Sequence, residues 1–403
     1  MEAVTLNLKI LFAVLRRESI DMKKITVLLL CVFLLCSCSI NSENKTTAQK
    51  EFNGMYLSYI ELLEMSISSD FKECFNDAVK NCKNMGITDM FVHIRAMCDS
   101  IYPSAYYPLT DWAKNLDFDV LSFIIEACHK NNIRFHAWIN PYRISSSTND
   151  LEKISPESPA HSLSHCIGDT EDGLYFDPSK EEVRRLIIDS IRELLNRYSV
   201  DGIHFDDYFY PTISPYFDLT SYNSYCSQTV NPLPLDSWRR ANVNSLISGV
   251  RTAIYNCDKP IMFSISPAAD IDNNENSLYA DIDYWCQTGF IDAVIPQLYF
   301  GFEYPLDEFK FENLLTHWIE YLSGTDTLLY VALAPYKLDT DQNPDSIEWK
   351  DGVDIISKQI SLINKNPFVD GFALYSYSFV FGEGENIQKQ KNKIIKSIKE
   401  VNL

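Results

Sequence analysis

The sequence predicts a single (β/α)8 barrel, an α/β fold in which parallel strands alternate with helices and the active site lies at the C-terminal face of the strands. Apolar, β-branched or aromatic runs of strand length alternate with amphipathic stretches of ten or more residues. No Gly/Pro/Ser-rich linker divides this series, and no internal sequence repeat accompanies it. An open doubly wound sheet is the alternative, but it seldom contains eight such units.

Eight strand patterns and six clear helix patterns define this alternation. We expect strands at residues 54–59, 89–95, 134–140, 202–207, 261–267, 293–299, 328–335 and 371–377. We expect helices at 71–85, 120–131, 180–198, 238–255, 351–363 and 385–398. A barrel of this class holds from about 200 to more than 400 residues in one domain, so one barrel accounts for this body.

The N-terminal region has the features of a secretory signal. Two lysines follow Met22, an apolar run spans residues 25–35, and Cys38 follows a serine. A basic segment, a short apolar segment and small residues before a cleavage point are typical of such signals. The end of the segment resembles a bacterial lipobox, so we expect lipidation at Cys38. A plain signal peptide that is cleaved nearby is the alternative.

We therefore expect three parts in the chain. Residues 1–37 form the signal region, with the true start at Met22. Residues 38–50 are polar and aperiodic, as a tether on a lipid anchor would be. Residues 51–403 form the barrel. This organisation predicts an exported lipoprotein of the bacterial cell envelope, held at the membrane through its N-terminal lipid.

Composition and cysteine spacing exclude several classes of function. The formal charge of −20 argues against nucleic acid as a partner and is compatible with a neutral or sugar-like substrate. No CxxC pair and no His-x-His motif occurs, so we expect no metal site and no cofactor. We also expect a monomer. Most of the cysteines that follow Cys38 are expected to be free, buried thiols: Cys74, Cys82, Cys98, Cys128, Cys166, Cys226, Cys257 and Cys286.

Alternation along the strands indicates which side chains face the barrel interior. In residues 202–207, Ile203 and Phe205 share one parity, whereas His204 and Asp206 share the other. Because apolar side chains of barrel strands pack outward on the helices, His204 and Asp206 should face inward, with Asp207 at the rim. The same test places these side chains inward or at a strand end: His93, Arg95, His136, Asn140, Ser264, Ser266, Gln297, Tyr299, Tyr336, Tyr375 and Tyr377.

Asp206 and Asp207 are the candidate catalytic residues. Hydrolysis of a glycosidic bond commonly needs one carboxylic acid and one carboxylate, and neighbouring carboxylates raise each other's proton affinity. An Asp-Asp pair that merely caps a turn is the structural alternative. Two long connections, residues 140–176 and 208–236, should lie on the same face, where long loops are often functional. We expect the substrate contacts to be Arg95, His136, Asn140, Tyr142, Arg143, His204, Tyr208, Gln297, Tyr299, Tyr336 and Tyr375.

Several long motifs resemble the glycosyl-hydrolase-like 10 family of bacterial barrel proteins, over about residues 52–379. The motif at the end of the fourth strand is Asp201-Gly202-Ile203-His204-Phe205-Asp206-Asp207-Tyr208-Phe209-Tyr210-Pro211. The others are His136-Ala137-Trp138-Ile139-Asn140-Pro141-Tyr142-Arg143, Tyr175-Phe176-Asp177-Pro178, Ile295-Pro296-Gln297-Leu298-Tyr299 and Ala334-Pro335-Tyr336-Lys337. The resemblance implies hydrolysis of bacterial glycans, and for some members hydrolysis of peptidoglycan strands without peptides.

The chain departs from these patterns at a few positions. Asn53-Gly54-Met55-Tyr56 replaces an Arg-Gly-Val-Trp-like first strand, and Arg95-Ala96 replaces an Arg-Pro pair. The fourth strand also resembles the Asp-Gly-x-Asp-x-Asp-x-Glu pattern of chitinase-type barrels, but Tyr208 stands where that pattern has its acid. Other carboxylates that follow strands are Asp270, Glu303 and Asp339, and each is an alternative second catalytic group.

The sequence therefore predicts a glycoside hydrolase that acts on a bacterial glycan through carboxylate acid/base catalysis, and the resemblance implies peptide-free peptidoglycan strands as one substrate. The alternative function is a non-catalytic cell-surface barrel that binds glycans, because a fold alone does not establish activity. A purely structural envelope protein is less compatible, since it does not require polar side chains inside the barrel.

Overall fold

The structure is a computed structural model that describes residues 52–68, 70–168, 170–171, 173–338, 346–350 and 352–400. The predicted signal region, the lipidation site Cys38 and the tether lie outside the described residues. Their assignment therefore stays a prediction from sequence, and the structural description begins with the first strand of the body.

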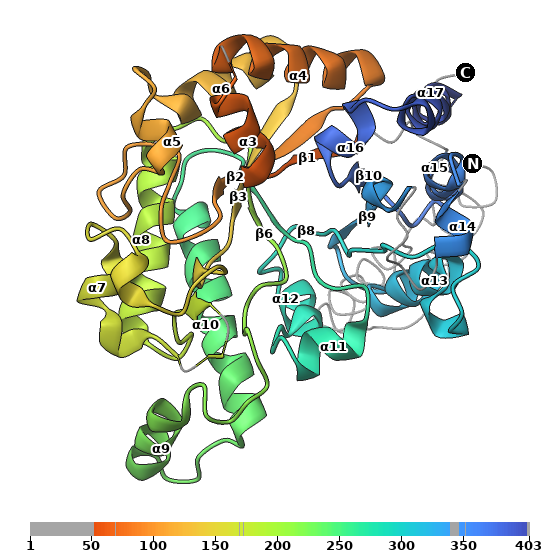
Figure 1. Ribbon diagram of the computed structural model, residues 1–403. Helices are drawn as coiled ribbons and strands as arrows, with labels where there is room; N and C mark the ends of the chain where they lie inside the picture. Colours follow the sequence, from red (N-terminus) through yellow and green to blue (C-terminus); the bar gives the residue numbers. More distant parts are fainter. Residues whose placement is uncertain are drawn as a thin grey trace, which may run out of the picture. The chain divides into compact units, whose positions relative to one another are not determined.

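Eight parallel strands close into a barrel, in the order β1-β10-β9-β8-β7-β6-β3-β2 (Figure 1). The predicted (β/α)8 fold is thus confirmed. Each predicted strand has its counterpart, and the observed bounds are β1 (Phe52–Leu57), β2 (Asp89–Arg95), β3 (Arg134–Ile139), β6 (Gly202–Phe205), β7 (Met262–Ile265), β8 (Ala293–Val294), β9 (Leu328–Leu333) and β10 (Gly371–Leu374). A two-stranded antiparallel sheet of β4 (Arg143–Ser145) and β5 (Leu174–Tyr175) lies in the long connection after β3.

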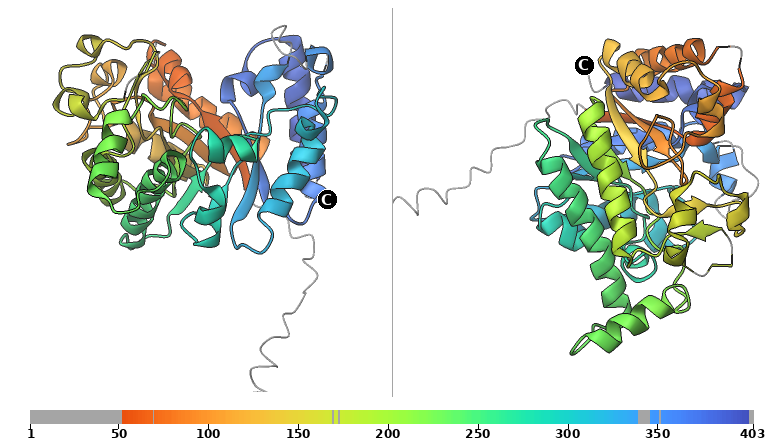
Figure 2. Two further views of the ribbon diagram at one scale, coloured as in Figure 1. Left: turned by 90° about the horizontal axis from the view of Figure 1, so that it is seen from below. Right: turned by 90° about the vertical axis from the view of Figure 1, so that its left-hand side faces the viewer.

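Helices cover the outside of the barrel, and α8 lies beside α10 in Figures 1 and 2. None of the helices among the described residues combines the length and the apolar character that a membrane span needs. The long helices are α4 (Phe71–Met85), α6 (Val120–Lys130), α8 (Glu181–Arg197), α10 (Leu235–Tyr255), α13 (Phe311–Tyr321), α15 (Ile355–Lys365) and α17 (Glu385–Glu400). The shorter ones are α3 (Tyr59–Ser66), α5 (Asp111–Lys114), α7 (Pro159–Ser162), α9 (Leu219–Gln228), α11 (Ile271–Asn276), α12 (Ile282–Gln287), α14 (Ser346–Lys350) and α16 (Tyr377–Phe381).

Seven of the eight barrel strands end earlier than predicted, most of all β8, which ends at Val294 instead of Tyr299. Two of these ends change the place of a side chain or begin a new helix. The first strand ends at Leu57, and α3 begins at once because Ser58 and Glu61 form a capping box, with the Ser58 amide donating to Glu61 Oε2 at 2.6 Å. The last strand ends at Leu374, so Tyr377 lies in α16 instead of facing the barrel interior. Its hydroxyl accepts a hydrogen bond from Asn81 of α4, outside the strands.

The lower half of the barrel interior holds a buried carboxylate, that of Asp89, with two hydrogen-bond donors. Asp89 accepts hydrogen bonds from Arg134 at 2.7 Å and from His136 Nε2 at 2.8 Å, and His136 is fully buried. Burial alone would raise the pKa of Asp89, but the bonds from His136 and Arg134 lower it below its ordinary value. Gly202 leaves room for the imidazole, because a Cβ there would lie 2.1 Å from His136 Nδ1. The prediction that His136 contacts substrate is therefore corrected.

Replacing His136 by phenylalanine is expected to lower the free energy of unfolding by about 1.5 to 3 kcal/mol, because a buried carboxylate loses a hydrogen-bond donor. His129 offers the matched control, since it contacts Asp201 at the same 2.8 Å distance with both side chains about one-third exposed. Its replacement by phenylalanine should cost about 1 kcal/mol or less. Urea unfolding of both variants measures the difference, and equal losses would contradict this account.

The eight cysteines in the described part of the chain are all free thiols. Five of them are buried, namely Cys82, Cys98, Cys128, Cys166 and Cys286, and the other three are partly buried. The expectation of mostly free, buried thiols is thereby confirmed for these residues. Burial raises the pKa of Cys98 to about 11, which leaves this thiol protonated and poorly reactive near neutral pH.

Candidate active site

Asp206 and Asp207 follow β6 directly, at the end of the barrel where the carboxyl ends of the strands meet. Asp206 is buried, and Asp207 is partly buried. Burial, together with the charge of Asp207, raises the pKa of Asp206 to about 7. Burial also raises the pKa of Asp207, against a hydrogen bond from the Gln297 side chain. Such a pair can hold a proton near neutral pH, as acid/base chemistry at a glycosidic bond requires.

The end of β3 supplies the side chains that contact Asp206. The indole N–H of Trp138 donates to Asp206 Oδ2 at 2.9 Å. The Asn140 amide lies against both Asp206 oxygens, and with its nitrogen facing them the distances are 2.5 and 2.6 Å. In this orientation the amide oxygen accepts from Arg143 and, at 3.1 Å, from His93 Nε2. Asn140 and Arg143 thus lie in the candidate site, where they support a carboxylate.

His93, which sequence alone left as either a core or a site residue, is part of this support. Its imidazole stacks on Trp138, with ring centroids 3.8 Å apart and an angle of 10° between the planes. Burial, followed by the charge of Arg143, holds the pKa of His93 well below its usual range, so the ring is neutral. The ring therefore packs beneath Trp138 without adding a charge to the site.

Three tyrosines form a wall on the opposite side of the barrel mouth. Tyr299, Tyr336 and Tyr375 follow β8, β9 and β10, and their ring centroids lie 5.8 to 6.0 Å from one another. All three side chains are partly buried, so one part of each faces solvent. We call these residues the tyrosine wall. Aromatic faces of this kind present a flat apolar surface, and their hydroxyl groups supply hydrogen bonds.

A cavity of about 380 Å³ adjoins the tyrosine wall. It lies among the segments that follow β7, β8 and β9, and Asp270, Gln297, Tyr299 and Tyr336 are among its lining residues. This volume is near the lower end of the range that small-molecule sites occupy, which suits one unit of a larger ligand. Gln297 links this cavity to the carboxylate pair, since it lines the cavity and its side-chain hydrogen bond lowers the pKa of Asp207.

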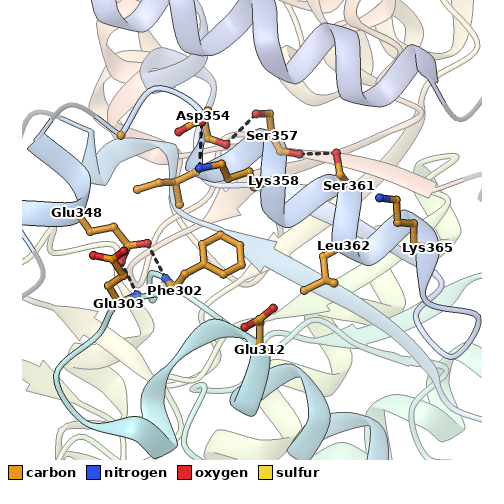
Figure 3. A pocket seen from close by; sticks show the side chains of 12 residues that line it. Phe302, Glu303, Glu312, Glu348, Asp354, Ser357, Lys358, Ser361, Leu362 and Lys365 are labelled. Atoms are coloured by element: carbon orange, nitrogen blue, oxygen red, sulfur yellow. Dashed lines mark hydrogen bonds and ion pairs between the residues drawn. The ribbon is translucent and has the colours of Figure 1, made fainter.

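A larger groove lies outside the barrel and away from this chemistry. Its volume is about 660 Å³, and it is lined by residues of α13, α15 and the segments before them, including Glu303 and Glu348 (Figure 3). Glu348 accepts from the backbone N–H groups of Phe302 and Glu303, so it holds a loop in place. Of the alternative carboxylates, Glu303 belongs to this outer groove, Asp270 lines the mouth cavity, and Asp339 lies outside the described residues.

Three more predicted contacts are buried away from the mouth. A register shift in β2 between His93 and Arg95 turns Arg95 toward α8, where its guanidinium donates to Ser190 at 3.1 Å. Tyr142 is fully buried within the apolar core. His204 lies one inward step below Asp206, fully buried, and its ring nitrogens contact Tyr56 and Ser264. The predictions that these residues touch substrate are corrected.

Tyr208 keeps its predicted place at the mouth. Its side chain is about half exposed, and the Arg143 guanidinium lies over its ring at 4.7 Å. Two inward residues at or beneath the site were missed: Trp138, which donates to Asp206, and Tyr56, whose ring lies 5.4 Å from that of Trp138. Both share the inward parity of their strands, with Trp138 between His136 and Asn140. The same alternation could have found them, but it was applied only to the more polar side chains.

The long connection that carries Asp207 and Tyr208 is anchored by one ion pair. Arg239 of α10 contacts Asp218 through two hydrogen bonds, of 2.9 and 2.6 Å, and both side chains are fully buried. The guanidinium also donates to the carbonyl groups of Ile213 and Ser214. Beyond this anchor, α9 lies at the start of α10 and apart from the barrel strands (Figures 1 and 2).

A sequence model of the family described as glycosyl hydrolase-like 10 matches residues 53–351, which is more than half of the chain. The chain belongs to this family. The glycosyl hydrolase YngK of Bacillus subtilis is 31% identical over 76% of this chain, and the chain spans 63% of its length. The glycosyl hydrolase DigH of Escherichia coli K12 is 26% identical over 91% of this chain and 95% of its own.

The barrel also resembles solved structures. The catalytic domain of a β-amylase from Paenibacillus polymyxa matches with a TM-score of 0.55 over 87% of this chain and 99% of its own, at 11% sequence identity. At that identity the similarity supports the fold. The family match and the fold together make this chain a barrel protein of the glycosyl hydrolase-like 10 family.

Proposed function

We propose that the chain hydrolyses glycosidic bonds of a bacterial glycan, with Asp206 and Asp207 as the acid/base pair. The observation that carries this proposal is the contact geometry of two adjacent carboxylates at the barrel mouth, one of them bonded by Trp138 and Asn140 and the other by Gln297. The tyrosine wall lies across the mouth from β3 and supplies the apolar surface on which a pyranose ring packs.

The substrate class that we propose is a peptidoglycan strand without peptides. The hydroxyl and acetamido groups of such a strand would meet the hydrogen-bonding side chains that line the mouth cavity. The small cavity beside Asp207 suits one sugar unit next to the bond that is cleaved. The second candidate function is capture of such a strand without cleavage, since the same wall and cavity would support binding.

Product analysis by mass spectrometry distinguishes the two candidates. The purified chain is incubated with peptide-free peptidoglycan strands and with a panel of neutral polysaccharides, beside a variant in which Asp206 and Asp207 are both asparagine. We expect shortened strands from the native chain only, with product masses that identify the bond. Binding of the strands without any product from the native chain would overturn hydrolysis and establish the capture function instead.

A further inference from the structure

We infer that the two carboxylates have different tasks: Asp206 works as the ionised carboxylate, and Asp207 donates the proton. This inference rests on the proposed glycosidic hydrolysis and deepens it by assigning roles within the pair. It also makes Trp138, Asn140 and Arg143 positioning residues, which act on the reaction through Asp206.

The first argument is that the hydrogen-bond partners of Asp206, among the residues that the structure describes, are all donors. Trp138 donates to Oδ2 at 2.9 Å, the Asn140 amide donates to both oxygens, and the Tyr208 backbone N–H donates to Oδ1 at 3.3 Å. Donors of this kind stabilise the charged form of a carboxyl group and oppose its protonation. The protonated form would need an acceptor for its own hydrogen, and these three partners all present N–H groups.

The second argument is that Arg143 sets the orientation of the Asn140 amide. A guanidinium carries donors only and stays charged, so the atom that faces it has to be the amide oxygen. His93 Nε2 lies 3.1 Å from the same oxygen and, as a neutral ring protonated there, donates to it as well. With the oxygen bound by two donors, the amide nitrogen has to face Asp206. The support for a charge on Asp206 is therefore built into the site.

Fewer side-chain donors hold a charge on Asp207. Gln297 donates to it, its own backbone N–H and the charge of Arg143 also lower its pKa, and it is partly exposed, so a substrate oxygen can reach it. Burial, followed by the charge of Asp207, raises the pKa of Asp206 to about 7, but the two Asn140 hydrogen bonds go to Asp206 and act in the opposite direction. When two adjacent carboxyl groups carry one negative charge between them, the charge is more stable on the group that accepts more hydrogen bonds. That group is Asp206.

The proton and electron flow follows from this division. The bond between the anomeric carbon and the glycosidic oxygen breaks, its electron pair stays on the oxygen, and the Asp207 proton moves to that oxygen. Asp206 either takes a proton from the water that attacks the anomeric carbon or bonds to that carbon first, after which Asp207 deprotonates the incoming water. In both the direct and the two-step route, Asp206 is ionised when the reaction starts. A water molecule supplies the hydroxyl group on the anomeric carbon and the proton that Asp207 regains.

The test compares two variants that should move opposite limbs of the pH–activity profile on peptide-free peptidoglycan strands. Trp138→Phe keeps an aromatic ring but removes a donor to Asp206, which raises the pKa of Asp206. Because Asp206 has to be ionised, the acid limb should move to higher pH by about one unit. Gln297→Leu removes the hydrogen bond that lowers the pKa of Asp207. Because Asp207 has to be protonated, the alkaline limb should move to higher pH.

Trp285→Phe is the matched control, since it removes an indole N–H that donates to Asn244 and to neither carboxylate, while an aromatic ring remains against Phe209. Its profile should match that of the native chain. A shift of the alkaline limb in Trp138→Phe would reverse the assignment and overturn the inference. A carboxyl-carbon NMR titration of the native chain measures the protonation of Asp206 and Asp207 without substrate. The two Asp→Asn variants assign the signals. If Asp207 loses its proton at a lower pH than Asp206, the role division is overturned. If the native chain forms no glycan products, only the proposed function is overturned.

Discussion

Replacing Asp206 by asparagine is expected to lower kcat on the cleaved glycan about 10²- to 10⁴-fold, the range that one acid/base group contributes. The amide has nearly the same shape, and its oxygen can still accept from Trp138, so the fold should be retained. What is lost is the negative charge beside the anomeric carbon, which matters most in the transition state. Initial rates by product quantification, with KM measured separately, check this expectation.

Asp270→Asn is the control for that experiment. Asp270 also follows a strand and lines the mouth cavity, but its carboxylate caps α11 by accepting from the Asp272 backbone N–H at 3.0 Å. Its replacement should leave kcat within a few-fold of the native value. The reverse pattern, with full activity in Asp206→Asn and loss in Asp270→Asn, would show that the catalytic carboxylate lies after β7 and not after β6.

Replacing Arg239 by methionine is expected to lower the free energy of unfolding by about 3 to 5 kcal/mol. Methionine keeps much of the side-chain volume, but it leaves the Asp218 carboxylate buried without its partner. It also removes the donors to Ile213 and Ser214, so the connection that carries Tyr208 should become sensitive to limited proteolysis. Urea unfolding, followed by digestion under native conditions, measures both effects.

Arg185 provides the matched control for Arg239. It also contacts a carboxylate at 2.6 Å, that of Glu181, but both side chains are more than half exposed. Arg185→Met should change the free energy of unfolding by about 0.5 kcal/mol or less. If the two arginine variants lose the same stability, burial is not what gives the Arg239 pair its effect, and the anchoring role of Arg239 is wrong.

The sequence was most informative where a local pattern is repeated many times. Alternating strand and helix patterns predicted all eight barrel strands, because each element has to bury its own apolar side. The Asp206–Asp207 pair was also found locally, since a polar side chain of inward parity at a strand end has few other uses. The predicted end of the first strand was wrong because a capping box at Ser58 begins a helix, although the β-branched and aromatic pattern continues to Tyr59.

Depth within the barrel was decided by the tertiary structure. Parity states whether a side chain faces inward, but it does not state in which layer it lies, and so His136 and His204 were expected at the mouth although they lie below it. The register shift in β2 had no local signal and turned Arg95 outward. Such features depend on how neighbouring strands pair, which one strand's sequence does not encode.

The sequence by itself therefore determined the fold and the family, and it predicted the two carboxylates as the catalytic pair. Only the tertiary structure showed that Trp138, Asn140 and Arg143 converge on Asp206, while Gln297, which follows β8, reaches Asp207 after β6. These partners come from strands that are far apart in the chain and are brought together by closure of the barrel. The physical reason is that the charge of a carboxyl group is set by the donors around it in space, and these donors are assembled only when the eight strands close.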